Sequence, residues 1–96
     1  MTEKSEVLNV LKQVKPELSE RFHVSSVGLF GSMVRGEHSE MSDIDIVVEF
    51  DRPVGIEFVD LAEYLQEKFN RRVDLVSKKG IKMHYLKSIE NEIEYA

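Results

Sequence analysis

The segment from residue 44 to residue 50 constrains the fold more than any other part of the sequence. Its residues are Ile-Asp-Ile-Val-Val-Glu-Phe, with an apolar side chain at every even position. Because successive side chains of a strand point to opposite faces, this pattern predicts a β-strand with one face turned to a core. Asp43 and Asp45 then share the other face. Aspartate is depleted in strands, so this pair indicates a particular requirement at this position.

The rest of the pattern predicts an α/β (α+β) domain with a small mixed sheet of three or four strands and helices on one face. Pro16 interrupts the first helical pattern and is placed at the start of a second short helix. At 96 residues the chain is expected to form one domain. Helices are expected over residues 4–14, 58–69 and 81–91, strands over 24–30, 44–50 and 72–76, and a short edge strand over 93–96.

A third acidic residue, Asp74, falls on the same open face as Asp43 and Asp45. Three carboxylates gathered on one face repel one another and attract divalent cations. Carboxylate oxygens suit hard ions such as Mg²⁺, and such a group could form the two-metal clamp used in phosphoryl transfer. In the alternative interpretation, Asp43 caps a turn and the other two are exposed strand acids.

A glycine and a serine directly follow the strand predicted over residues 24–30. Gly31 allows the backbone to approach a ligand closely, and the free N–H groups at a helix start, beside Ser32, would form an anion site. Arg35 could reach a phosphate oxygen, brace a carboxylate or form a surface ion pair. The segment is not a Walker A loop, because Glu37-His38 stands where Lys-Ser/Thr is required.

Composition excludes several classes of protein. The net charge of -5 argues against a dedicated duplex nucleic-acid binder, which usually carries a basic footprint. The absence of cysteine removes disulfides and thiolate chemistry. No apolar run approaches the roughly 18 residues of a membrane span, and no signal peptide is expected. These features are typical of a cytoplasmic protein that does not enter membranes.

The strongest signal is a composite motif. Gly31-Ser32, ten further residues and then Asp43-Ile44-Asp45 resemble the G-S-x10-D-x-D signature of minimal nucleotidyltransferases. These belong to the DNA polymerase beta-like nucleotidyltransferase superfamily. The fuller string from Phe30 to Gly36 is also similar to that subgroup, and the resemblance covers essentially the whole chain. It implies a single minimal nucleotidyltransferase domain over residues 1–96, with a palm-like core.

The resemblance also implies the chemistry of the carboxylates. Asp43 and Asp45 would hold two Mg²⁺ ions, and Asp74 would complete the metal site nearer the attacking hydroxyl. In such sites one ion lowers the pKa of the attacking hydroxyl and the other neutralises the leaving pyrophosphate. All three aspartates are therefore expected to be catalytic residues and metal ligands.

The same resemblance implies a nucleotide and a partner. Gly31, Ser32 and Arg35 would bind the triphosphate, with ATP as donor of AMP. Family members often pair with a HEPN-domain protein as toxin and antitoxin, and the nucleotidyltransferase then adenylylates a tyrosine of that partner. The acceptor must be presented by a partner or by a second copy of the chain. The basic stretch from Arg71 to Lys87 is one candidate docking surface, and the edge near Tyr95 is another.

Two other interpretations remain open from the sequence. A binding module would neutralise its partner by capture at a fixed ratio, without transfer. A metal-dependent nuclease would use the carboxylates but leave Gly31-Ser32 unexplained. His38, between the two halves of the motif, is expected to be an exposed loop residue, and the basic stretch could be only a solvated edge.

Overall fold

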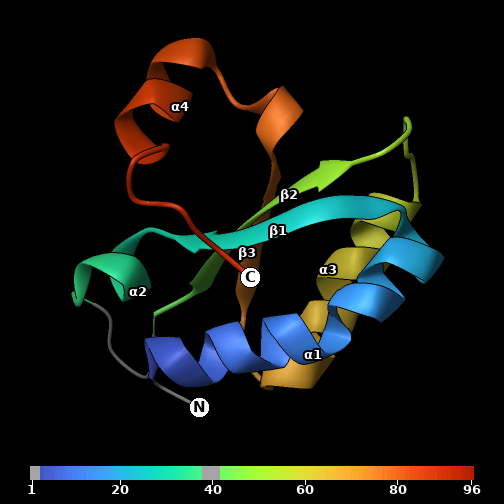
Figure 1. The fold of residues 1–96 in the computed structure, drawn as a ribbon, viewed down its shortest axis with the longest axis horizontal. Helices are drawn as coiled ribbons and strands as arrows, with labels where there is room; N and C mark the ends of the chain where they lie inside the picture. Colours follow the sequence, from blue (N-terminus) through green and yellow to red (C-terminus); the bar gives the residue numbers. More distant parts are fainter. Residues whose placement is uncertain (1–2, 38–41) are drawn as a thin grey trace.

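A four-stranded mixed sheet organises the chain, with strand order β3-β2-β1-β4 (Figure 1). The computed structural model describes residues 3–37 and 42–96. The elements along the chain are α1 (Lys4–Phe22), β1 (Val24–Phe30), α2 (Ser32–Arg35), β2 (Ile44–Phe50), α3 (Glu57–Phe69), β3 (Val73–Ser77), the 3-10 helix η1 (Lys78–Gly80), α4 (Met83–Ile89) and β4 (Glu94–Tyr95). The predicted mixed sheet, including its short edge strand, is confirmed.

The direction of the strands decides which residues share an end of the sheet. β1 runs antiparallel to both β2 and β4, whereas β2 and β3 are parallel. A parallel pair needs a crossover connection, and α3 provides it. The register sets Ile44 beside Val73 and Asp45 beside Asp74. The aspartates of two separate strands are thereby brought together at one end of the sheet.

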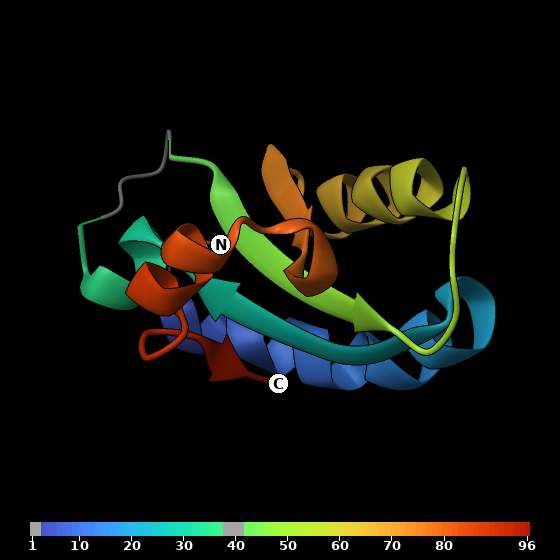
Figure 2. The ribbon, with the colours of Figure 1, turned by 90° about the horizontal axis from the view of Figure 1, so that it is seen from above.

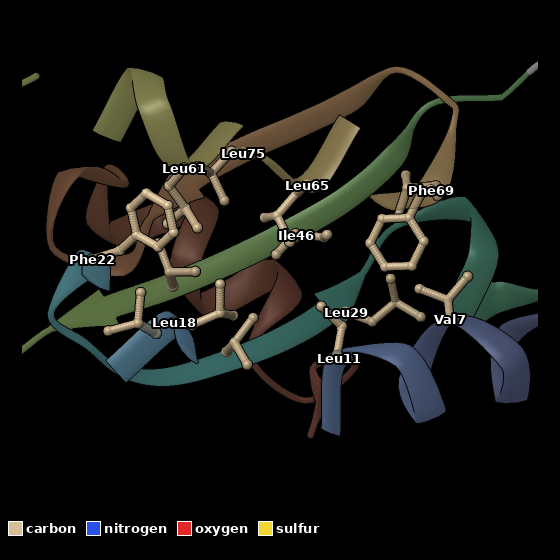
Figure 3. Packing of buried hydrophobic residues seen from close by; sticks show 14 of the residues in the cluster. Val7, Leu11, Leu18, Phe22, Leu29, Ile46, Leu61, Leu65, Phe69 and Leu75 are labelled. Carbon is tan, nitrogen blue, oxygen red and sulfur yellow. The ribbon is translucent and has the colours of Figure 1, made fainter. Parts of the chain in front are cut away.

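The alternating pattern of β2 builds the main core. Ile44, Ile46 and Val48 are essentially inaccessible to solvent and face α1 and α3. Figure 3 shows Ile46 surrounded by apolar side chains of both helices and of the neighbouring strands. Burial of each such side chain contributes about 1.5–3 kcal/mol. A slip of one residue would turn this set to the other face, so the core also fixes the register.

The first helix corrects the prediction made for Pro16. The helix α1 does not end near residue 14 but continues through Pro16 to Phe22, so that it is 19 residues long. A proline in a helix interior removes one hydrogen bond and costs about 3 kcal/mol, but Pro16 lies on the exposed side, where water can solvate the freed carbonyl. Buried residues on both sides of the proline hold the helix to the sheet: Val7, Leu11, Leu18 and Phe22.

The second face of the sheet is partly covered by the C-terminal part of the chain. In Figure 1, α4 lies above the sheet and α1 and α3 lie below it. Ile89 of α4 packs with Phe30 and Val47 in a second, smaller apolar cluster. The sequence predicted helices on one face only, and α4 corrects this because its apolar residue Ile89 covers part of the second face. None of the helices in the described parts of the chain is both long and apolar enough to cross a membrane.

We expect Ile46→Ala to lower the free energy of unfolding by about 2–5 kcal/mol, because it leaves a cavity in a fully buried site. Urea denaturation measures the change. The matched control is Ile56→Ala, which makes the same chemical change at a side chain that is 74% exposed. Its effect should stay within about 0.5 kcal/mol. Equal losses in the two variants would contradict this description of the core.

Candidate active site

The centre of the candidate site is the Asp45 carboxylate. Asp45 is half-buried on β2, and its carboxyl group shares a hydrogen bond with that of Asp74 on β3. Burial, followed by the negative charges of Asp74 and Asp43, raises the pKa of Asp45 to about 6. The backbone N–H of Ser32 donates to the carboxylate and acts in the opposite direction. The site therefore concentrates negative charge in a partly desolvated position.

Gly31 is the residue that lets the backbone approach this carboxylate. Its φ of 79° and ψ of -151° form a conformation that residues with a side chain rarely adopt. A Cβ added at Gly31 would collide with the Asp45 carboxylate. Glycine is therefore required here both by the backbone conformation and by the space that Asp45 occupies.

A residue that the sequence did not reveal, Glu92, completes the surroundings of this loop. The backbone N–H of Gly31 donates to Glu92 Oε2 at 2.7 Å, although the two residues are 61 positions apart. The guanidinium of Arg35 donates through Nη1 to the same oxygen at 3.1 Å. The chain turns back after α4 (Figure 2), and these hydrogen bonds place Glu92 beside Gly31 and α2. No periodic pattern or motif in the sequence singles out Glu92.

Arg35 forms ion pairs with two carboxylates. Its Nε donates to Glu37 at 3.0 Å, while Nη1 contacts Glu92. The hydrogen bond with Glu37, followed by the charges of Glu37 and Glu92, raises the pKa of the guanidinium. Of the roles left open for Arg35, the structure shows ion pairing at the surface. Its partners are the two glutamates rather than any of the three predicted aspartates.

The structure brings the three predicted aspartates to the same region, but only two of them face each other. Asp45 and Asp74 face each other, whereas Asp43 precedes β2 and is exposed, close enough to influence the Asp45 pKa. In the described parts of the chain, no three or more His, Cys, Asp or Glu side chains are grouped tightly enough to hold a metal ion. His38 lies outside the described residues.

The facing carboxylates nevertheless fit a hard divalent cation. Both offer oxygen ligands of the kind that Mg²⁺ prefers. Burial and then the charges of Asp74 and Asp43 raise the pKa of Asp45, and a cation would relieve the repulsion between the carboxylates. Asp43, one residue before β2, offers a further carboxylate on the same stretch of chain.

Comparison with known proteins decides the family. A family model described as a nucleotidyltransferase domain matches residues 11–96. The chain belongs to this nucleotidyltransferase family. It is 44% identical over 91 residues to protein adenylyltransferase MntA of Thermococcus cleftensis, covering 94% of this chain and 92% of that protein. The predicted family is therefore confirmed, and the chain is a nucleotidyltransferase.

Two solved structures share the fold of this nucleotidyltransferase. One, provisionally described as a minimal nucleotidyltransferase, has a TM-score of 0.78 and 29% identity, covering 93% of this chain and 92% of that one. The other is described as a tri-AMPylated Shewanella oneidensis HEPN toxin in complex with MNT antitoxin. It has a TM-score of 0.69 and 20% identity, covering 95% of this chain and 69% of that one. At that identity the second likeness concerns the fold alone.

The raised pKa of Asp45 predicts a particular dependence of stability on pH. The folded protein binds this proton more tightly than the unfolded chain, whose value is near 3.8. The resulting stability is full below about pH 4 and is lost as the pH rises through about 6. Asp45→Asn cannot ionise, so it should gain about 1 kcal/mol over the wild type between about pH 4 and about pH 7, allowing for solvent screening.

Urea denaturation in the presence of EDTA measures this difference. Asp60→Asn, at an exposed position of α3, controls for the general loss of one carboxylate. A difference between Asp45→Asn and wild type that does not change with pH would contradict the raised pKa of Asp45.

Proposed function

We propose that this nucleotidyltransferase transfers AMP from ATP to a hydroxyl group of a protein partner, with two Mg²⁺ ions, as a single domain over residues 1–96. The observation that carries the proposal is the pairing of Asp45 with Asp74 across parallel strands, directly beneath the Gly31-Ser32 loop. A metal-dependent phosphoryl transfer needs carboxylates to hold the metal and, next to them, backbone N–H groups to bind the phosphates.

The metal would be held by the facing pair Asp45 and Asp74, and Asp43 would complete the set by moving closer to them. When bound there, Mg²⁺ supplies neutralisation of phosphate charge and a lower pKa for the attacking hydroxyl. Asp45 is held in place by the Ser32 N–H and by its neighbour across the strand pair. Asp74 is more exposed than Asp45, so an acceptor can approach it from solvent. The protein thus contributes orientation and fixed charge at the reacting atoms.

The triphosphate would be bound by Gly31, Ser32 and Arg35. The Gly31 N–H and the Arg35 guanidinium each already contact an anionic oxygen, that of Glu92. These groups therefore bind anions in the folded protein, as the charge and geometry of a phosphate oxygen also require. The neighbouring Ser32 N–H donates to the Asp45 carboxylate.

We further propose that the acceptor is a tyrosine of a HEPN-type toxin and that the chain acts as its antitoxin in the cytoplasm. The Thermococcus cleftensis relative is named a protein adenylyltransferase, and the Shewanella oneidensis structure pairs an AMPylated HEPN toxin with its antitoxin. Both descriptions concern those proteins. They support the proposal because the sequence identity with the first extends over nearly the whole chain.

A surface next to Asp74 suits the approach of such a partner. Val76 shares with Asp74 the open face of β3, and it lines a cleft of about 610 Å³ between β3, η1 and α4. Lys82 and the 48% exposed Tyr85 line the same cleft. Apart from Phe58 of α3, the residues that line the cleft belong to the basic stretch from Arg71 to Lys87. The cleft therefore combines positive charge with apolar area, as protein interfaces often do.

We expect Asp45→Asn to reduce transfer of labelled AMP by at least about 100-fold, the loss typical when one charge-stabilising group is removed from an active site. The variant should remain folded by circular dichroism. Glu49→Gln is the matched control, because Glu49 lies on the same strand and face but outside the site. It should retain transfer. Undiminished transfer by Asp45→Asn would refute the metal-dependent mechanism.

The dose of protein separates transfer from capture. With the HEPN acceptor in large molar excess, mass spectrometry should detect AMP on more acceptor molecules than there are molecules of this chain. EDTA should stop the reaction and added Mg²⁺ should restore it. Neutralisation that saturates at a fixed ratio, without AMP on the acceptor, would instead establish a binding module.

A further inference from the structure

Glu92 occupies two of the groups that the proposed function assigns to the triphosphate. Its Oε2 accepts from the Gly31 N–H at 2.7 Å, and the Arg35 Nη1 lies 3.3 Å from Oε1 and 3.1 Å from Oε2. The Glu92 side chain is only 20% exposed. A carboxylate held by a backbone N–H and a guanidinium is bound in the same way as a phosphate oxygen would be.

These contacts and a bound phosphate exclude each other. A backbone N–H has a single hydrogen, so the Gly31 donor serves one acceptor with good geometry. Two of the three guanidinium nitrogens of Arg35 are engaged as well, since Nε contacts Glu37 while Nη1 contacts Glu92. A polyanion placed beside Glu92 would also meet its negative charge at short range.

We propose that Glu92 is an autoinhibitory carboxylate, which a nucleoside triphosphate must displace from the Gly31 N–H and from Arg35 before it can bind. This inference rests on the proposed function, which assigns those groups to the triphosphate. Only molecules in which Glu92 has released these groups can bind nucleotide. The apparent affinity for nucleotide is therefore the intrinsic affinity multiplied by the fraction of such molecules. It sets the nucleotide concentration at which the enzyme becomes loaded.

Displacement requires movement of one side chain rather than unfolding of the C-terminal segment. The Glu92 backbone N–H donates to the carbonyl of Ile89, which is buried in the second apolar cluster. Ile93 packs against the same cluster, and Glu94 pairs with Lys4 of α1. The backbone on both sides of Glu92 is thus anchored. The carboxylate can leave by rotation about its own side-chain bonds, while the backbone stays in place.

Isothermal titration of ATP with Mg²⁺ tests the proposal directly. We expect Glu92→Gln to lower the Kd for ATP about fivefold, the low end of typical coupling between sites, because the ion pair is partly exposed. Glu90→Gln is the matched control, since it makes the same change of charge two residues earlier at an exposed position. The control should leave the Kd at the wild-type value.

Each other result has a defined meaning. A Kd that is unchanged or raised in Glu92→Gln, with ATP bound by the wild type, overturns the autoinhibitory role and leaves the proposed function intact. No ATP binding by the wild type or by either variant overturns the proposed function itself.

A measurement on the wild-type protein covers the case in which Glu92→Gln does not fold. Carbon NMR follows the side-chain carboxyl resonance of Glu92 as ATP and Mg²⁺ are added. Displacement predicts that this resonance moves toward the position of the exposed Glu90 carboxylate. A Glu92 resonance that stays in place while ATP binds overturns the proposal.

Discussion

The parallel register between β2 and β3 is the constraint on which the rest of the site depends. It places Asp45 opposite Asp74, so that two carboxylates share a partly desolvated position. Left to themselves these groups would repel each other. The register is held because the opposite faces of both strands, including Ile46 and Leu75, are buried in the main core. The energy of apolar packing thus maintains an electrostatically unfavourable arrangement that a cation would relieve.

The loop after β1 is the second half of the same arrangement. Gly31 lets the backbone lie against Asp45, and the Ser32 N–H partly compensates the carboxylate charge. On its other side the loop binds Glu92, which arrives from the opposite end of the chain. The N–H groups of this loop are therefore satisfied by carboxylates on both sides. Because these are anion-binding groups, nucleotide binding is an exchange of one anion for another.

Most of the fold followed from local patterns, since the alternation in β2 and the helical spacing in α3 are local properties. The shared face of Asp45 and Asp74 was also predictable, because strand alternation and a parallel pairing suffice for it. The continuation of α1 through Pro16 was not, because the tertiary contacts of Leu18 and Phe22 outweigh the local cost of proline. The role of Glu92 could not be predicted either, because it depends on the path that the chain takes after α4.

The central claim is that the aspartates and the Gly31-Ser32 loop form one site for a metal–nucleotide complex. The most direct test is the melting temperature with ATP and Mg²⁺ together and with each alone. Ligand at about 100 times its Kd adds about 2.7 kcal/mol of stability, and each kcal/mol raises Tm by about 4–8 °C in a domain of this size. We predict an increase of more than about 10 °C that requires both components. A Tm that ATP and Mg²⁺ together leave unchanged would contradict this account of the site.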